Sequence, residues 1–290
     1  MIAVYRLRWL PAVPYAMAGY AIRLALAFVL IHPIASVVER TLAGWPANEH
    51  MMFHSGSLLF SEVLRLHGVA FHGLLEQLAL GALLMIPIGI VIHAFVIASF
   101  VDPDTRDLKA IASLAIARML PVAVVSLLSL LAISGMMILS WVIREGVRSM
   151  LPFDTRTNDM LSLGSILVGA LAVVVSLVMT DLARIATIRD KLGVAEAIAL
   201  ALHSVRKRPF EIFGAFGARV SASIFLAMVG LTFPLMFGIE TSIPASCWII
   251  VQQVIVVVMS CLRLSWLARA ASFQPRLSQQ GSIDLEIPMR

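Results

Sequence analysis

Residues 119–143 read MLPVAVVSLLSLLAISGMMILSWVI, an uncharged stretch of 25 residues between Arg118 and Arg144. About 20 apolar residues in an α-helix cross the ~30 Å hydrocarbon core of a bilayer, so this stretch predicts a membrane-spanning helix. It is too long and too uniformly apolar for an alternating barrel strand, and a helix satisfies its own backbone hydrogen bonds in lipid. We therefore predict an all-α, membrane-embedded fold.

Five further stretches have the same character. Together they predict a polytopic protein with six transmembrane helices, at about 19–39, 76–101, 119–143, 160–180, 219–239 and 243–264. The composition agrees, with 60% hydrophobic and 13% charged residues, whereas soluble domains contain about 25% charged residues. Residues 1–270 are expected to form a single transmembrane domain, followed by a polar cytoplasmic tail at 271–290.

The distribution of basic residues predicts the orientation of the spans. With the N-terminus in the cytoplasm, 16 of the 22 Lys and Arg residues fall on the cytoplasmic side and five on the outer side, and Arg23 begins the first span. By the positive-inside rule, both termini are then cytoplasmic. Anionic lipid headgroups account for the net charge of +5, so nucleic acid is not needed as a partner. We expect a multi-pass protein of a bacterial inner membrane, with lipids and other membrane proteins as partners.

Two segments between spans are predicted to be amphipathic elbow helices on the cytoplasmic side. The first follows an acidic boundary, covers residues 108–120 and ends at Pro121. The second follows another acidic boundary and ends at Pro209. Each unit of inward helix, elbow and outward helix has the same direction. This favours a parallel internal repeat, although short matches in Ala-rich helices also arise by chance.

The second elbow has the clearer pattern. It carries an apolar stripe at Val194, Ile198, Ala201 and Val205. A basic amphipathic helix of this kind is expected to lie in the headgroup layer, because its apolar stripe would otherwise face water. Its basic end is then predicted to contact lipid headgroups through Arg206, Lys207 and Arg208.

Four polar residues stand within the predicted spans, and we take them as candidate intramembrane contacts: His32, His93, Gln252 and Gln253. Amides at this depth most often bond to a neighbouring helix, and the alternative is a substrate pathway. Each histidine is either hydrogen-bonded between helices or the ligand of a haem- or chlorophyll-type metal. One haem cannot easily take both, because they differ in depth by roughly 10 Å. The sequence itself requires no cofactor.

The outer loop, residues 40–75, contains a candidate metal site at His50 and His54. On a helix these two residues would share a face, and Met51 and Met52 lie between them. Imidazole with thioether suits copper, and imidazole with carboxylate suits zinc. The alternative is that these side chains only pack at the membrane surface. The same loop is expected to form a short amphipathic helix around Leu59–Ala70.

Sequence motifs for catalysis are absent from the chain. It contains no GxxxxGK[ST] phosphate loop, no HExxH zinc motif and no GxSxG elbow. The acids Glu76 and Asp181 are expected at span ends, where the interface hydrates them, so neither forms an intramembrane proton relay. These absences favour a protein that is not an enzyme.

One motif carries a resemblance to a known family. Asp181-Leu-Ala-Arg184 is followed by an Ala-rich elbow, a basic turn ending in Pro209 and a further span. Together with six spans, this resembles the membrane domain found beside glycerophosphodiester phosphodiesterases and its stand-alone bacterial relatives. The resemblance covers roughly residues 75–270 and implies a membrane-embedded accessory or lipid-facing role. It carries over no catalytic residues.

Three functions follow as expectations. The first is a non-enzymatic, lipid-facing integral subunit or scaffold of a larger membrane complex. The second is a transporter or permease component for a small molecule or lipid, with the four polar residues lining a path. The third is a cofactor- or pigment-carrying subunit of a photosynthetic or respiratory complex. In a transporter the polar residues should share a cavity, whereas in a scaffold each should be satisfied by a neighbouring helix.

Overall fold

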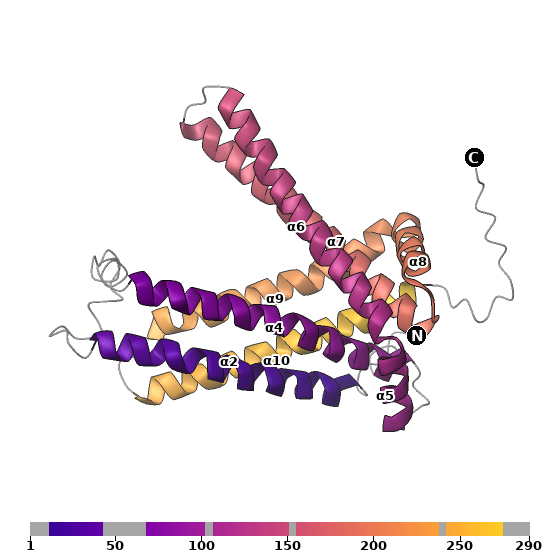
Figure 1. Cartoon of the computed structure of the whole chain (residues 1–290), viewed down its shortest axis with the longest axis horizontal. Helices are drawn as coiled ribbons and strands as arrows, with labels where there is room; N and C mark the ends of the chain where they lie inside the picture. The colour runs from indigo at the N-terminus through magenta and orange to yellow at the C-terminus, as the bar shows by residue number, and fades with distance from the viewer. Residues whose placement is uncertain (1–11, 43–67, 102–106, 151–154, 238–241, 275–290) are drawn as a thin grey trace, which may run out of the picture. The chain divides into compact units, whose positions relative to one another are not determined.

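The computed structural model describes residues 12–42, 68–101, 107–150, 155–237 and 242–274. Within these residues the chain is helical and contains no strand, which confirms the predicted all-α class. The helices (Figure 1) are α2 (Val13–Leu42), α4 (Gly68–Val101), α5 (Leu108–Ala117), α6 (Met119–Met150), α7 (Thr155–Arg189), α8 (Val194–Lys207), α9 (Pro209–Phe237) and α10 (Ser242–Phe273). The predicted outer-loop helix lies mostly outside the described residues, as do His50 and His54.

Five of the described helices are long and apolar enough to cross a membrane. Their candidate spans are Leu75–Phe100, Met119–Ser149, Asp159–Arg189, Pro209–Gly230 and Ile249–Phe273. The chain is therefore a helical, multi-pass membrane protein by length and composition. The first predicted span, 19–39, lies inside the 30-residue helix α2. The apolar part of α2 that is described, Val13–Val29, is too short to count as a candidate span. The predicted span at 19–39 therefore stays a prediction.

The helix α7 runs further than the sequence predicted. The uncharged run ends at Thr180, but α7 continues to Arg189 and takes Asp181 and Arg184 with it. Both side chains find partners on neighbouring helices, described below, so the first charge does not end the helix. The expected hydration of Asp181 at the interface is wrong, because its side chain is only 1% exposed.

The chain divides into two compact units. The smaller unit covers Pro14–Ile92 and contains α2 and most of α4. Within it, Gly19 of α2 lies so close to Ile92 of α4 that an added Cβ would stand 2.6 Å from Ile92 Cγ2. A glycine at this position lets the two helices approach closely, as small residues commonly do between membrane helices.

The larger unit, from His93 onward, is built from helix pairs. The helices α6 and α7 form one hairpin and α9 and α10 another, and α8 packs on α7 (Figure 1). Large buried side chains from α7 and α10 form the core where these two helices meet, including Leu182, Ile185 and Leu267. Trp266 of α10 belongs to the same core, and Phe216 of α9 packs edge-on against it with ring centroids 5.0 Å apart. Three helices thus converge on this point.

Two short helices occupy the positions predicted for the elbows. In α5, Asp107 caps the N-terminus by accepting a hydrogen bond from Lys109 N at 3.0 Å. In α8, Glu196 Oε2 accepts from Gly193 N at 3.0 Å, which caps the first turn. The order long helix, short helix, long helix occurs twice, in α4–α5–α6 and α7–α8–α9. That order agrees with the predicted repeat; a location in the headgroup layer stays a prediction.

The buried face of α8 differs from the predicted apolar stripe. Its buried residues are Ala197, Ala201 and Ser204, whereas Ile198 is exposed. The small side chains allow α8 to lie close to α7, and the larger apolar ones flank that contact instead of filling it. Only Ala201 of the predicted stripe belongs to the face that packs against protein, and contact of the rest with lipid stays a prediction.

Candidate functional site

A buried carboxylate marks the most polar point inside the larger unit. Asp181 lies in α7, one residue after the end of the uncharged run. Burying an ionised carboxylate in a low-dielectric environment costs several kcal/mol unless it is paired and hydrogen-bonded. These partners come from α10 and from α7 itself.

The helix α10 supplies the two closest partners. Arg263 Nη2 donates to Asp181 Oδ1 at 2.6 Å, and Trp266 Nε1 donates to Asp181 Oδ2 at 2.7 Å. Because residues three apart lie on one helix face, α10 presents both donors to α7 at the same level. Each carboxylate oxygen therefore receives its own donor, and the pair fixes the register of α10 against α7.

Arg184 completes the cluster and connects it to α6. Its Nη1 lies 3.7 Å from Asp181 Oδ1. Its Nε donates to Ser126 Oγ of α6 at 2.9 Å. Ser126 in turn donates to the carbonyl oxygen of Val122, so its hydroxyl is held in an orientation that accepts from Arg184. We call Ser126, Asp181, Arg184, Arg263 and Trp266 the Asp181 cluster.

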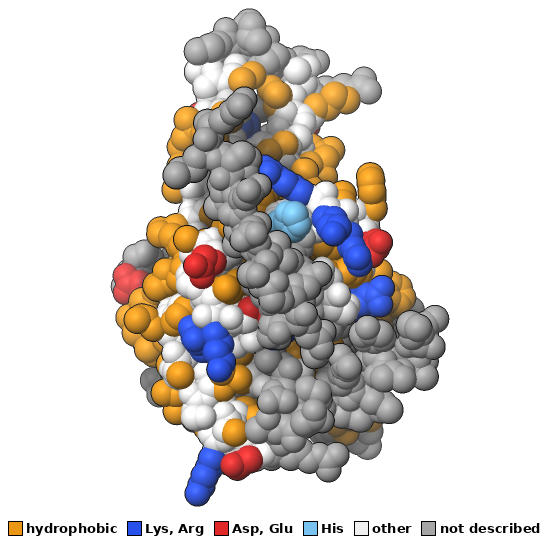
Figure 2. Space-filling model, turned by 90° about the vertical axis from the view of Figure 1, so that its right-hand side faces the viewer, with side chains coloured by type: hydrophobic (Ala, Val, Ile, Leu, Met, Phe, Trp, Pro, Cys, Tyr) orange, Lys and Arg blue, Asp and Glu red, His pale blue; other side chains and the backbone are white. Residues whose placement is uncertain are grey.

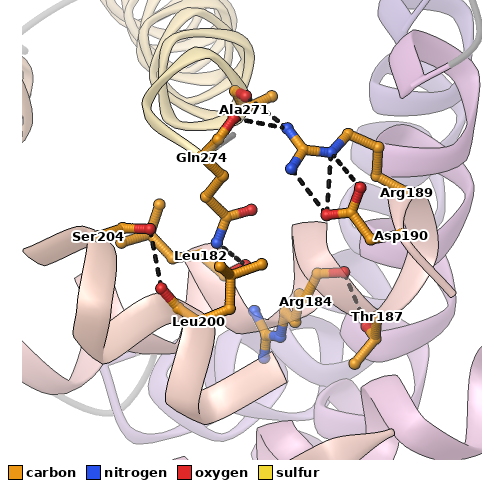
Figure 3. Close-up of polar contacts among 9 residues, drawn as sticks. All are labelled: Leu182, Arg184, Thr187, Arg189, Asp190, Leu200, Ser204, Ala271 and Gln274. Atoms are coloured by element: carbon orange, nitrogen blue, oxygen red, sulfur yellow. Dashed lines mark hydrogen bonds and ion pairs between the residues drawn. The ribbon is translucent and has the colours of Figure 1, made fainter. Parts of the chain in front are cut away.

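A second polar layer lies toward the ends of α7 and α10 (Figure 3). Arg189 and Asp190 form a bidentate ion pair, with Nε–Oδ1 at 3.0 Å and Nη2–Oδ2 at 2.7 Å. Arg189 Nη1 also donates to the carbonyl oxygen of Ala271 at 2.8 Å. From the opposite direction, Gln274 Nε2 donates to the carbonyl oxygen of Leu182 at 2.9 Å. These bonds satisfy carbonyl groups of both helices and fasten α10 to α7 a second time.

Another arginine within the candidate spans also forms hydrogen bonds inside the protein. Arg219 Nε donates to Ser265 Oγ at 2.8 Å, and Arg219 Nη1 donates to the carbonyl oxygen of Ala215 at 2.7 Å. The first of these bonds joins α9 to α10. Arg219 therefore extends the polar network from α6, α7 and α10 to α9.

The Asp181 cluster carries one negative and two positive charges. The carboxylate accepts bonds from Arg263 and Trp266 and has Arg184 beside it, so its oxygens face donors of the protein itself. A general base needs a carboxylate oxygen that can reach a proton of the substrate, whereas both oxygens of Asp181 already accept bonds from the protein. The described residues contain no group of three or more His, Cys, Asp or Glu side chains that could hold a metal ion. The arrangement is that of a helix-fastening network.

The polar residues singled out from sequence are placed as follows. Gln252 Nε2 donates to the carbonyl oxygen of Gly230 at 2.7 Å, so this amide bonds from α10 to α9. The neighbouring Gln253 has a buried Oε1 without a hydrogen-bond partner. His93 of α4 is half-buried and not free of partners. His32 belongs to α2, and its side chain lies outside the described part.

The basic residues expected at lipid headgroups lie at the end of α8. Arg206, Lys207 and Arg208 are exposed there, and Arg208 is the C-cap residue. Arg208 Nη1 stands 3.9 Å from Glu211 Oε2. Their contact with headgroups stays a prediction.

Sequence reasoning did not select the Asp181 cluster as a site. A usable signal existed, because Asp181 and Arg184 are three residues apart, as are Arg263 and Trp266, and each pair therefore shares a helix face. The charges were instead read as the ends of spans.

Comparison with known proteins adds no relative. No protein-family model, no curated protein and no solved structure matches this chain. By composition and fold, the chain belongs to the class of helical multi-pass membrane proteins.

Proposed function

We propose that the chain is a non-enzymatic integral subunit that scaffolds a larger membrane complex. The observation that carries this proposal is the internal use of its charged groups. Asp181 is held by Arg263 and Trp266, and Arg184 is held by Ser126 and Asp181. A charged residue inside a membrane span usually suggests a functional site, such as a substrate or ion pathway. Here they fasten α6, α7 and α10 to one another, which is the task of a rigid framework.

A transporter or permease component is the alternative. In transporters, polar residues of the spans line a common path to the substrate. Gln252 instead donates to the Gly230 carbonyl of the adjacent helix, and this contact fixes α9 against α10. Gly230 leaves room for the amide, because an added Cβ would stand 3.0 Å from Gln252 Nε2. This use of a polar residue supports the scaffold over transport.

The surface of the α6–α7 hairpin supports a contact with another protein. Two grooves follow the seam between the helices, with volumes of about 490 Å³ and 260 Å³. The larger groove contains Ser140 and Ser165, whose hydroxyl oxygens lie 2.9 Å apart, and Gly164, where an added Cβ would meet nothing within 4 Å. Small residues on a lipid-exposed face allow another helix to approach closely. We propose an apolar helix of a partner subunit as the occupant.

Site-specific photo-crosslinking tests this role. A photoreactive amino acid replaces Val168, which lines the larger groove and is 57% exposed, or Leu167, which is 61% exposed and does not line it. In native membranes, the Val168 probe should yield a discrete protein adduct, and the Leu167 probe should react mainly with lipid. Lipid adducts alone from both positions, or equal protein adducts from both, would contradict the proposed contact.

A further inference from the structure

A small cavity with several basic side chains lies between the C-terminal ends of α8 and α10. Its volume is about 150 Å³, and its lining includes His203, Ser204, Lys207, Arg208, Ser272 and Gln274. Figure 2 views this end of the molecule, where Lys and Arg side chains gather beside a histidine. None of the residues that line the cavity is acidic. The cavity therefore has one sign of charge.

The positive charge at this cavity is only weakly compensated by the described residues. Lys207 and His203 make no ion pair or hydrogen bond to any described side chain. Arg208 has Glu211 as its ion-pair partner, at 3.9 Å, and both side chains are about half exposed. An exposed ion pair at that distance is weak. An anion that enters the cavity would therefore meet basic groups that have not already been satisfied.

Of the remaining lining residues, Phe273 is apolar, whereas Ser204, Ser272 and Gln274 are polar and held in place by hydrogen bonds. Ser204 Oγ donates to the carbonyl oxygen of Leu200 at 2.8 Å, and Ser272 Oγ donates to that of Arg269 at 2.6 Å. Gln274 is 3% exposed and is fixed through its bond to the Leu182 carbonyl. Each hydroxyl oxygen keeps a lone pair that can accept from a hydroxyl group of a ligand. Figure 3 shows Ser204 and Gln274 approaching from α8 and from the end of α10.

We propose that this cavity binds a phosphate group, carried by a lipid headgroup or by a small soluble phosphate ester. Lysine and arginine bind phosphate through charge-assisted hydrogen bonds, and the walls hold both side-chain types together. Basic pockets between membrane helices on the cytoplasmic side are typical headgroup sites.

The surface beside the cavity has the character of a segment that lies at the level of the lipid headgroups. Phe210, two residues after Arg208, is 92% exposed. An exposed aromatic ring beside basic residues is typical of the membrane interface, where rings insert below the headgroups. The cavity thus lies where a lipid phosphate can reach it. This site does not depend on the scaffold role, so either proposal can fail alone.

The test compares two single lysine substitutions on different helices. Lys207→Gln removes a charge that lines the cavity, whereas Lys109→Gln removes an exposed charge of α5 that does not line it. Glutamine keeps a helix propensity close to that of lysine and arginine. The purified protein in maltoside is incubated with phosphatidylglycerol, with phosphate-free diacylglycerol, or with glycerol 1-phosphate. Lipid retention is measured by native mass spectrometry and binding of the soluble ester by calorimetry.

For a lipid source, phosphatidylglycerol is retained over diacylglycerol, and Lys207→Gln weakens retention about tenfold, equivalent to about 1.4 kcal/mol. For a soluble source, glycerol 1-phosphate binds with the same dependence on Lys207, while phosphatidylglycerol shows none. In both cases Lys109→Gln changes binding less than twofold. The proposal is overturned if neither phosphate compound binds, or if the two variants weaken binding equally while both retain the wild-type thermal midpoint.

Discussion

Replacing Asp181 by asparagine is the sharpest perturbation of the polar network. Asparagine has nearly the same size, and its oxygen can still accept from Trp266. The negative charge is lost, however, and Arg263 and Arg184 lose the carboxylate that stands 2.6 Å and 3.7 Å from their guanidinium nitrogens. The substitution therefore isolates the electrostatic part of the contact from its packing.

The expected cost follows from burial. Removing one partner of a buried ion pair costs about 3–5 kcal/mol, because it leaves an uncompensated charge. The side chain of Arg184 is 14% exposed and that of Arg263 is 34% exposed. Because Arg263 can turn partly toward water or headgroups, we expect the lower end, about 3 kcal/mol of unfolding free energy.

The assay is reversible unfolding in mixed detergent micelles with increasing dodecyl sulfate, followed by circular dichroism. Asp159→Asn is the matched control, because Asp159 is an exposed acid on the same helix α7. It should change stability by no more than about 0.5 kcal/mol. An Asp181→Asn variant that is as stable as this control would refute the reasoning.

A double substitution sharpens the same test. If the cost arises from an unpaired Arg263, then Arg263→Gln should add little to Asp181→Asn. The coupling energy of the pair is expected at about 1–3 kcal/mol, in the range measured for contacting residues. Additive effects of the two substitutions would show that the 2.6 Å contact contributes no net stability.

Three further predictions concern other contacts. Gln252→Leu should lower the free energy of unfolding by roughly 0.6–2 kcal/mol, because it removes the hydrogen bond to the Gly230 carbonyl. Gln253→Leu should cost less, because it removes a buried oxygen that has no partner. Unfolding in mixed micelles compares the two variants, and equal costs would contradict the assignment. Gly19→Ala should lower stability by about 1–3 kcal/mol, since its Cβ would stand 2.6 Å from a side-chain carbon; an unchanged thermal midpoint would show that the helices separate freely. The last of these predictions is a combined charge reversal at the basic end of α8, at Arg206, Lys207 and Arg208. It should reduce binding to anionic liposomes or disturb membrane topology more than any change in the outer loop. Unchanged binding and unchanged topology would refute this prediction.

The sequence was sufficient to predict the helical, membrane-spanning class. Long uncharged runs reveal spans because lipid excludes unsatisfied backbone and charge, and this depends on no tertiary contact. The positions of α5 and α8 were also predictable, since acidic caps and basic ends frame both segments. The face of α8 that packs against protein could not be predicted, because small residues pack closely only when a neighbouring helix is present.

The Asp181 cluster could not be assembled from sequence periodicity alone. Asp181 was expected at the end of a span, and Arg219 and Arg263 stand within two residues of predicted span limits, yet all three lie within long helices. A charge ends a span only when no neighbour compensates it, and compensation comes from residues far away in sequence. Asp181 and Arg263, for example, are 82 residues apart. Such pairs become visible only when the helices are placed side by side.

The most direct test of the scaffold role is purification from native membranes in a mild detergent, followed by quantitative mass spectrometry. The account predicts that one or more membrane proteins accompany the chain in a fixed stoichiometry, and that they dissociate when bulky residues fill the α6–α7 groove at Gly164. A chain that elutes alone, or with lipid only, would contradict the scaffold role and favour transport or lipid handling.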